Sequence, residues 1–380
     1  MNAASPARAL EERIAALGAA PGFRNYLYVR DRVLEMRAQV DAAPDYKPSA
    51  YWKEELANFE YMLDASPLII DKLRAHSFHI TGLHVHDYRS GRDRKRDRYA
   101  DKLRALLAQG KPELFVPEPD TLGGFGFTID GHLVNLDTMK FFEVLIALDK
   151  GAVLDEFRSD SERKLVWEVG AGWGGFPYQF KTLCPNTTYL ISDFPELFLF
   201  SATYLMTLFP GAKVRFWGEE PAERIFANWR DYDFIFTPNT ALNDLTPDRL
   251  DLAVNMVSFQ EMTKAQVTSY VAKSHELGAR FLYSLNREKS AMNDELDSVS
   301  RIVSQYYWPR EVQVLKVSYQ KMLDETSLGK AAKQEAVQLT RQRLAGMEEF
   351  MEVTNKIFQQ FVSNAKSGLN KVVRVLLKAL

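Results

Sequence analysis

The chain has 380 residues, of which 46% are apolar and 26% are charged, a composition typical of a folded protein with about two domains. Its 48 Lys and Arg nearly balance its 50 Asp and Glu, so we do not expect a nucleic-acid-binding protein, which needs a surplus of positive charge. The single cysteine, Cys184, cannot form an internal disulfide, which favours the cytoplasm. No apolar run approaches the roughly 18 residues of a transmembrane helix, and the charged start, with Glu11 and Arg13, does not resemble a signal peptide.

The first 155 residues are predicted to form a mainly helical domain with one β-hairpin. Ser66-Pro67 indicates a helix start that leads toward Arg74, and Asp130-Gly131 is a two-residue hairpin signal between the β-rich runs 125–129 and 132–135. Two sets of apolar residues at spacings of three and four each predict one helix face: Tyr26, Val29, Val33, Met36 and Val40, and Trp52, Leu56, Phe59 and Leu63.

The stretch 156–322 is predicted to form a second domain of the α/β class. Short β-rich runs alternate with helical segments, which indicates a doubly wound, mainly parallel, Rossmann-like sheet. Thr263 and Gln266 form a capping-box pattern at one helix start, and Gly278 marks the end of that helix. The predicted strands are 165–169, 188–192, 214–217, 234–236, 252–257, 281–285 and 312–317.

The stretch 323–380 is predicted to be a helical extension. Its apolar seam predicts one long helix that packs on the same chain or forms a homo-oligomer interface. The last twelve residues, 369–380, are amphipathic and basic, which is compatible with packing or with peripheral contact with a membrane surface. The seam consists of Leu344, Met347, Met351, Phe358 and Phe361.

A glycine-rich turn follows the first predicted strand of the sheet, in the stretch 164–175. Glycines allow the backbone to turn tightly and to approach a ligand, with the amides of the next helix facing it. The second strand ends at Asp193, where a carboxylate can accept hydrogen bonds from both ribose hydroxyls of an adenosine. Together they predict a nucleoside-cofactor site at the carboxyl ends of the strands.

Two cofactor classes fit this turn. Gly170, Gly172 and Gly175 have the G-x-G-x-x-G spacing of dinucleotide-binding enzymes, a weak signal when it stands alone. Glu168, however, would repel a pyrophosphate and suits the positive charge of S-adenosylmethionine, and Trp173 is bulky where a dinucleotide's phosphates would come close. The turn therefore favours S-adenosylmethionine over NAD.

Three motifs give the chain a resemblance to a known family. They are E-V-G-A-G-W-G-G at 168–175, S-D-F-P-E at 192–196 and D-L-A-V-N-M-V-S-F-Q-E-M at 251–262. Together they resemble the class I S-adenosylmethionine-dependent methyltransferases, and the third resembles the sugar O-methyltransferase family in particular. The resemblance covers residues 160–290 and is fainter between residues 63 and 82.

The resemblance implies a set of cofactor contacts. Glu168 and the loop glycines would hold the methionine and ribose part, Asp193 the ribose, and Phe194 would flank the adenine. One strand-like run too many lies between Asp193 and Asp251, so either 214–217 or 234–236 is the third strand, and the adenine contact of Asn239 depends on which. The implied cofactor-binding residues are Glu168, Gly170, Ala171, Gly172, Trp173, Gly174, Asp193, Phe194, Asn239, Asn255 and Ser258.

Methyl transfer to a sugar hydroxyl needs alignment first, and a general base contributes a further factor of about 10² to 10⁴. Glu261, at the end of the fourth-strand motif, and His132, in the hairpin, are the candidate bases, each with a structural role as the alternative. The N-terminal histidines could mark the acceptor-binding face or be structural, and a zinc site among them is a minor alternative without a cysteine or carboxylate partner. These histidines are His76, His79, His84, His86 and His132. No carboxylate cluster identifies a magnesium site, so no metal is predicted.

The expected activity is thus O-methylation of a sugar hydroxyl in a surface polysaccharide or a glycosylated metabolite, with the N-terminal domain helping to bind the acceptor. The basic run 89–98 is either a solvated face or a clamp for the phosphate of a nucleotide-linked or lipid-linked sugar. An NAD-dependent sugar oxidoreductase and a non-catalytic scaffold subunit are the alternatives. A peptide or polyketide acceptor would keep the same chemistry.

Overall fold

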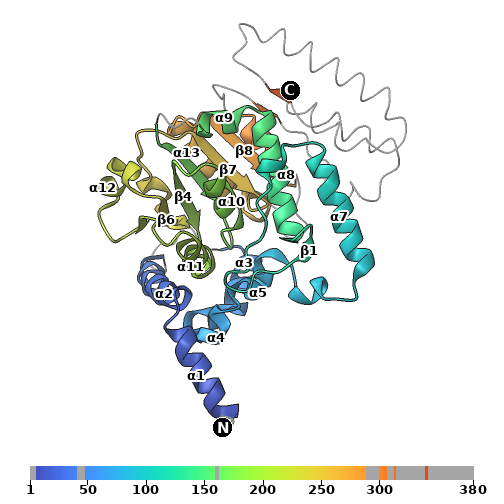
Figure 1. The fold of residues 1–380 in the computed structure, drawn as a ribbon. Coiled ribbons are helices and arrows are strands. Elements are labelled where there is room, and N and C mark those ends of the chain that lie inside the picture. The colour runs from blue at the N-terminus through green and yellow to red at the C-terminus, as the bar shows by residue number, and fades with distance from the viewer. Residues whose placement is uncertain are drawn as a thin grey trace. The chain divides into compact units, whose positions relative to one another are not determined.

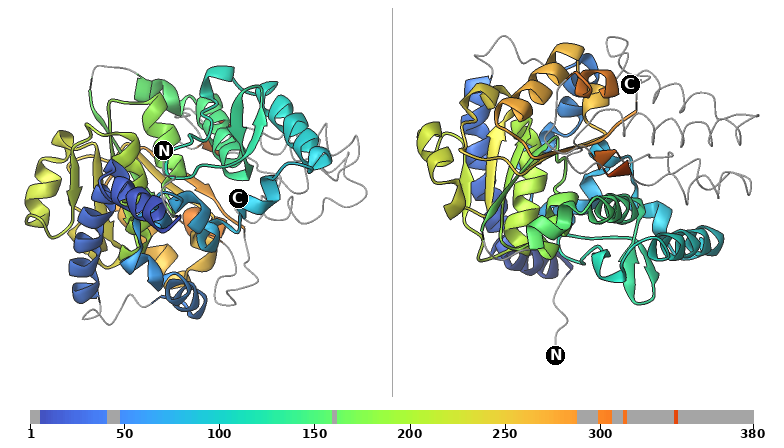
Figure 2. Two further views of the ribbon diagram at one scale, coloured as in Figure 1. Left: turned by 60° about the horizontal axis from the view of Figure 1, so that its bottom comes forward. Right: turned by 90° about the horizontal axis from the view of Figure 1, so that it is seen from above.

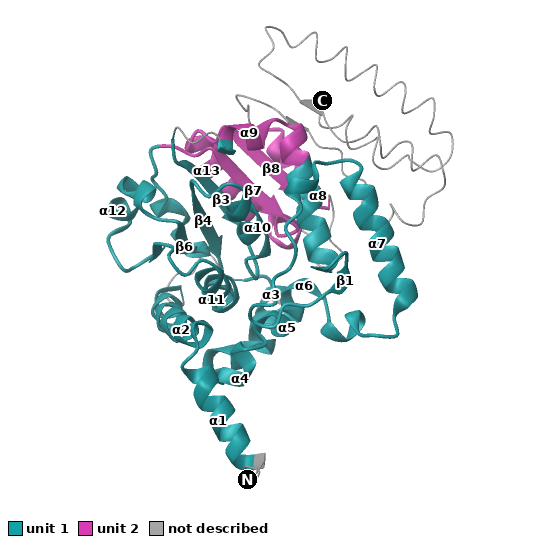
Figure 3. Cartoon of the chain, in the orientation of Figure 1, with its two compact units in different colours: residues 1–146, 157–248 teal, residues 147–156, 249–380 magenta. Residues whose placement is uncertain are grey.

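The structure is a computed structural model that describes residues 6–40, 48–158, 162–287, 299–305, 312–313 and 339–340. The chain divides into two compact units, of which unit 1 comprises Met1–Ile146 and Phe157–Asp248, and unit 2 comprises Ala147–Glu156 and Arg249–Leu380 (Figure 3). Unit 1 thus combines the N-terminal helices with the first strands of the large sheet. The domain boundaries predicted from the sequence stay a prediction.

Helices make up most of the N-terminal part of unit 1 (Figure 1). The helix predicted from residue 26 onward is confirmed, because α2 buries Tyr26, Val29, Val33 and Met36 and packs against α11 (Figures 1 and 2). The elements up to residue 114 are α1 (Pro6–Gly18), α2 (Pro21–Val40), α3 (Ala50–Asn58), the 3-10 helix η1 (Glu60–Asp64), α4 (Pro67–Ile70), α5 (Leu73–His76), α6 (Phe78–Thr81), η2 (Val85–Tyr88), α7 (Asp93–Leu107) and η3 (Pro112–Leu114).

Two predicted helices are shorter than expected. The one predicted between Trp52 and Leu63 ends at Asn58 and continues as the 3-10 helix η1. The one predicted from Ser66-Pro67 toward Arg74 is split into α4 and α5, because the backbone N–H of Arg74 donates to Leu122 O at 2.9 Å rather than to a carbonyl of its own helix. A tertiary hydrogen bond therefore breaks this helix one turn after its proline.

The predicted hairpin is confirmed. Strand β1 (Phe127–Ile129) pairs antiparallel with β2 (His132–Val134). Asp130 and Gly131 between them have φ values of 50° and 80°, as a two-residue turn with the twist of the strands requires. Two helices follow the hairpin, α8 (Leu136–Lys150) and α9 (Val153–Arg158).

The predicted α/β class is confirmed by a six-stranded sheet with the order β5-β6-β4-β3-β7-β8. In unit 1, β5, β6, β4 and β3 pair in parallel in that order, and in unit 2, β7 pairs in parallel with β8. Every residue of β3, β4 and β6 is buried, as in a parallel sheet covered on both faces. The strands are β3 (Lys164–Val169), β4 (Thr187–Asp193), β5 (Val214–Phe216), β6 (Phe234–Pro238), β7 (Leu252–Met256) and β8 (Phe281–Leu285).

The strand next to β4 is β6, and β5 forms the edge beyond it. The run 214–217 is thus the additional edge strand, and 234–236 takes the position beside the second strand. The connecting elements are α10 (Gly175–Leu183), η4 (Pro195–Leu197), α11 (Phe198–Leu208), α12 (Ala222–Ala227), η5 (Trp229–Asp231), η6 (Asn239–Asp244), η7 (Phe259–Glu261), α13 (Lys264–Glu276) and α14 (Val299–Val303).

The capping box of α13 is confirmed, with Thr263 and Gln266 exchanging both hydrogen bonds, and Gly278 follows the helix with a φ of 66°. The strand predicted at 312–317 is wrong as a member of the parallel sheet, because β9 (Val312–Gln313) pairs antiparallel with β10 (Leu339–Thr340). The predicted seam of Leu344 to Phe361 and the amphipathic end 369–380 lie outside the described residues. Within the part that is described, no helix has both the length and the apolar character needed to cross a bilayer.

Candidate functional site

The glycine loop connects β3 to α10 at the carboxyl ends of the parallel strands. Gly170, Gly172 and Gly174 all have positive φ, at 76°, 59° and 88°, a region that costs side chains with a Cβ about 1–2 kcal/mol. A Cβ at Gly172 would lie 2.9 Å from Ile80 Cγ2, and one at Gly174 would lie 3.0 Å from Ser201 Cα. Both backbone conformation and tight packing therefore require glycine here.

The carboxylate of Asp193 holds this loop from the neighbouring strand. Its Oδ2 accepts a hydrogen bond from the backbone N–H of Gly172 at 3.0 Å, and its Oδ1 accepts one from the N–H of Phe194 at 2.9 Å. The N–H of Gly170 donates to Ser192 O at 2.8 Å and continues the strand pairing up to the turn. The structure thus brings together the glycine loop and the acid that the sequence singled out.

Glu168 lies on the same face of the sheet as Asp193, one residue before β3 ends. Its side chain is buried and accepts a hydrogen bond from Tyr189 Oη at 2.7 Å. Burial raises the pKa of Glu168 to about 8; the Tyr189 bond opposes this shift and the nearby charge of Asp193 adds to it. A positive charge placed nearby would lower that pKa again, because it stabilises the carboxylate.

Two more predicted residues lie at the same ends of the strands, Phe194 after β4 and Asn239 after β6. Pro238 at the end of β6 is paired with Asp193, so Asn239, which follows it, lies beside the Asp193-Phe194 end of β4. Asn239 is 8% exposed, and the Phe194 ring lies 5.7 Å from that of Trp52, between ring centroids. Glu168, the glycine loop, Asp193, Phe194 and Asn239 therefore gather at the ends of three adjacent strands.

Three further predicted site residues, Asn255, Ser258 and Glu261, belong to unit 2. Asn255, buried at the end of β7, accepts hydrogen bonds through Oδ1 from the N–H of Phe259 at 3.1 Å and from Asn286 Nδ2 at 2.8 Å. Glu261 closes η7, and its N–H donates to Ser258 O at 3.0 Å. The hydrogen bonds of Asn255 therefore fix the turn that carries Ser258 and Glu261.

Val257, directly after β7, has a φ of 67° and is 37% exposed. Such a conformation is rare for a β-branched residue, and residues held in strained conformations cluster at functional sites. The strained backbone at Val257 is therefore a second indication, besides the motif at 251–262, that this turn belongs to a functional site.

Four of the five histidines of the N-terminal region lie near one another, and His132 stands apart on the hairpin. The rings of His84 and His86 lie 5.1 Å apart, between centroids, and the Phe78 ring contacts both His79 and His84. His132 is exposed on the hairpin, with its ring 6.2 Å from that of Phe115. His76 Nδ1 lies 2.8 Å from Tyr61 Oη, and burial lowers its pKa. His79 Nδ1 lies 3.4 Å from a carboxylate oxygen of Glu55. Among the described residues, no three His, Cys, Asp or Glu side chains are grouped so that they could hold a metal ion.

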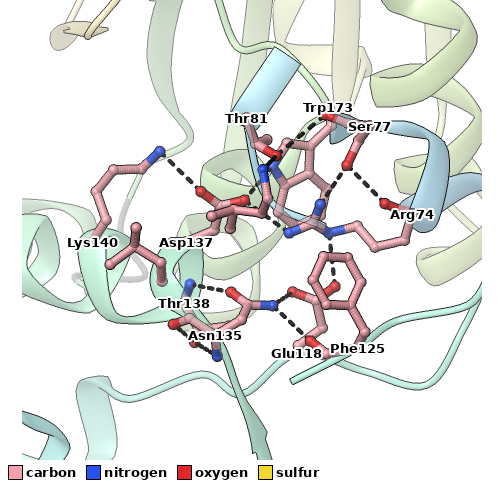
Figure 4. Close-up of polar contacts among 12 residues, drawn as sticks. Arg74, Ser77, Thr81, Glu118, Phe125, Asn135, Asp137, Thr138, Lys140 and Trp173 are labelled. Carbon is pink, nitrogen blue, oxygen red and sulfur yellow. Dashed lines mark hydrogen bonds and ion pairs between the residues drawn. The ribbon is translucent and has the colours of Figure 1, made fainter. Parts of the chain in front are cut away.

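Sequence reasoning missed a buried polar cluster behind the glycine loop (Figure 4). The side chain of Trp173 turns away from solvent into this cluster, with the indole Nε1–H donating to Asp137 Oδ2 at 3.1 Å. Arg74 lies over the indole ring, with its Cζ 3.6 Å from the ring centroid. The N-cap Asn135 before α8 is the one local signal of the cluster, because the backbone N–H of each of Asn135 and Thr138 donates to the side-chain oxygen of the other.

The chain matches no protein-family model, and no curated protein is significantly similar to it in sequence.

Proposed function

We propose that the chain is an S-adenosylmethionine-dependent O-methyltransferase that acts on a hydroxyl of a sugar. The observation that carries the proposal is the glycine loop of β3 held by Asp193 of β4, with the buried Glu168 on the same sheet face. In a parallel sheet, ligands bind at the carboxyl ends of the strands, which is where these groups meet. We propose likewise that the α/β fold of the chain is that of the class I methyltransferases.

The chemistry of these groups fits a cationic nucleoside. Asp193 would accept hydrogen bonds from the ribose hydroxyls, and the loop backbone from Gly170 to Gly174 would lie against the ribose and methionine part. Phe194 and Asn239 would border the adenine. The buried Glu168 favours a positively charged ligand, since a cation lowers the cost of its ionisation. When bound, S-adenosylmethionine would supply the activated methyl group.

The packing around Gly175 also explains why a glycine stands at the last position of the G-x-G-x-x-G spacing. A Cβ at Gly175 would lie 2.3 Å from a ring carbon of Trp173 and 2.5 Å from one of Phe141. This glycine is therefore required by side-chain packing, whichever ligand the loop binds.

The acceptor class is inferred from the resemblance of the motif at 251–262 to sugar O-methyltransferases. For in-line transfer, the protein has to align the acceptor oxygen with the methyl group and to exclude water. We assign Glu261 as the first candidate to take the hydroxyl proton, because it closes the strained turn after β7. His132, exposed on the hairpin, is the second candidate.

The test is transfer of a tritiated methyl group from S-adenosylmethionine to a panel of free sugars, nucleotide-linked sugars and oligosaccharides, with peptides as a counter-panel. We expect label in a sugar, and a loss of about 10²-fold or more with Glu261→Gln if this residue is the base. Glu276→Gln, an exposed acid at the end of α13, is the matched control. Label in peptides alone would refute the sugar acceptor, and unchanged turnover of Glu261→Gln would refute its role as base.

A further inference from the structure

Trp173 is the one large side chain inside the glycine loop, and its surroundings are charged. It is 5% exposed, and its indole ring packs edge-on against Tyr204, with ring centroids 5.0 Å apart. Its indole N–H bonds to Asp137, and the guanidinium of Arg74 covers its face at 3.6 Å. A buried guanidinium over an indole gains about 2 kcal/mol or more from the ring's quadrupole. The loop is therefore attached through Trp173 to a residue of α5 and a residue of α8.

Arg74 itself is held from three sides, although its side chain is completely buried. Its Nε lies 2.7 Å from Glu118 Oε1, its Nη2 lies 2.8 Å from Asp137 Oδ2, and its Nη1 donates to Ser77 Oγ. Glu118 is fixed in turn by Asn135 Nδ2 at 2.5 Å. The planar fork of an arginine suits this arrangement, because it can meet two carboxylates in fixed directions.

The cluster contains two basic and two acidic side chains. Arg74 and Lys140 face Glu118 and Asp137, with Lys140 Nζ 3.1 Å from Asp137 Oδ1. Burial opposes ionisation of Asp137, but Lys140 and Arg74 outweigh it and lower the pKa of this carboxyl. For Glu118, burial outweighs Arg74, and its pKa is raised. Asp137 is thus the charged acceptor that the Trp173 N–H and the Arg74 fork share.

A second contact joins the same helical segment to the loop. Ile80 of α6, six residues after Arg74, lies against Gly172, where an added Cβ would meet its Cγ2 at 2.9 Å. The amide of Gly172 is also the one that Asp193 binds. The segment of α5 and α6 therefore restrains the loop at two successive residues, Gly172 and Trp173.

We propose that Arg74 and Asp137 form a clamp that holds Trp173, and through it sets the ligand-binding shape of the glycine loop. In this role, Arg74 and Asp137 are positioning residues, which lie behind the loop. That the bound ligand is an S-adenosyl compound rests on the function proposed above, whereas the order of the loop can be measured without any ligand.

The test compares three variants by hydrogen exchange and by calorimetry. Trp173→Phe keeps an aromatic ring under Arg74 but removes the N–H that bonds to Asp137. Asp137→Asn removes the shared charge and keeps the size of the side chain. Asp233→Asn is the control, because Asp233 binds Lys181 Nζ at 2.8 Å and Arg163 in a polar cluster at the opposite ends of the same strands.

We expect hydrogen exchange of the amides 170–175 to be faster in Trp173→Phe and Asp137→Asn than in the wild type. In Asp233→Asn, exchange of these amides should stay at the wild-type rate, even when this variant loses as much stability as the other two. S-adenosylhomocysteine should bind about three- to tenfold more weakly to the first two variants, as the loss of one hydrogen bond predicts. Because both substitutions act on the contact between Trp173 and Asp137, the double variant should lose less than the product of the two single effects.

Wild-type exchange rates at residues 170–175 in Trp173→Phe and in Asp137→Asn would overturn the clamp. So would a rise that Asp233→Asn reproduces, because the effect would then follow from stability alone. If the wild-type chain does not bind S-adenosylhomocysteine while the two variants still loosen the loop, the proposed function is wrong and the clamp holds.

Discussion

The amide of Gly172 donates a hydrogen bond to the carboxylate of Asp193, 21 positions later in the chain, at 3.0 Å. This bond links the turn after β3 with the end of β4, where the two strands run in parallel. A loop fixed in this way has an ordered backbone, which would reduce the entropy that binding of the proposed ligand costs. The relationship makes the conformation of Gly172 the first feature to test.

Gly172→Ala should weaken ligand binding and destabilise the fold. The φ of +59° costs an alanine about 1–2 kcal/mol, and its Cβ would in addition meet Ile80 Cγ2 at 2.9 Å. Urea unfolding and titration with S-adenosylhomocysteine measure the two effects.

Gly131→Ala in the hairpin is the matched control for Gly172→Ala, since Gly131 has a φ of +80° but no neighbour within 4 Å of an added Cβ. Gly131→Ala should lose only the stability that the positive φ costs, and it should leave the binding of S-adenosylhomocysteine unchanged. The double variant Gly172→Ala/Ile80→Ala should regain part of the lost stability. Equal stability of Gly172→Ala and wild type would contradict the described loop conformation.

Glu168→Gln should flatten part of the dependence of stability on pH. In the folded chain, burial raises the pKa of Glu168 to about 8, above its ordinary value of 4.5. The folded state therefore binds a proton that the unfolded state releases, and this contribution is present at low pH and is lost as the pH rises through this window. The wild type should lose on the order of a few kcal/mol between pH 5 and 8 relative to Glu168→Gln.

Unfolding free energies at pH 5, 6, 7 and 8 provide this comparison for Glu168. Glu276→Gln, an exposed acid on α13, controls for the loss of a charge. A constant difference between wild type and Glu168→Gln across the pH range would show that Glu168 is ionised throughout, contrary to its burial.

Much of the loop and its acid could be predicted because the signals are local. A β-rich run that leads into a glycine-rich turn encodes β3, the loop and α10 within one short stretch, and Asp193 ends the next strand. The same holds for the hairpin at Asp130-Gly131 and for the capping box of α13. In each case, the interacting residues are neighbours in sequence, or belong to consecutive strands whose order the fold class fixes.

The clamp could not be predicted, because Arg74, Asp137 and Trp173 come from three distant places in the chain. An arginine between Leu73 and Ala75 has no sequence feature that marks it as buried, and its burial depends on two carboxylates that reach it only in the folded state. The break between α4 and α5 could not be predicted for the same reason, because the Arg74 N–H donates to the carbonyl of Leu122, which is distant in sequence. The position of β5 at the edge likewise depends on tertiary packing.

Thr263→Ala should destabilise the chain by about 1 kcal/mol, the usual loss for a removed N-cap. Thr263 Oγ1 accepts from the N–H of Gln266 at 3.2 Å, and Gln266 Oε1 accepts from the N–H of Thr263 at 3.0 Å. Thr268→Ala, a partly exposed position on the same helix, is the control and should change stability by less than about 0.5 kcal/mol. If both variants unfold at the same urea concentration, the capping box does not stabilise α13.

The most direct test of the proposed cofactor is calorimetric titration with S-adenosylhomocysteine and, separately, with NAD. The wild type should bind S-adenosylhomocysteine and not NAD. Asp193→Ala should weaken this binding by about 10-fold or more, since hydrogen bonds to a charged group are worth about 1.5–3 kcal/mol. Asp231→Ala, an exposed acid in η5, should leave it unchanged. Binding of NAD, or equal affinity of Asp193→Ala and wild type for S-adenosylhomocysteine, would contradict the account.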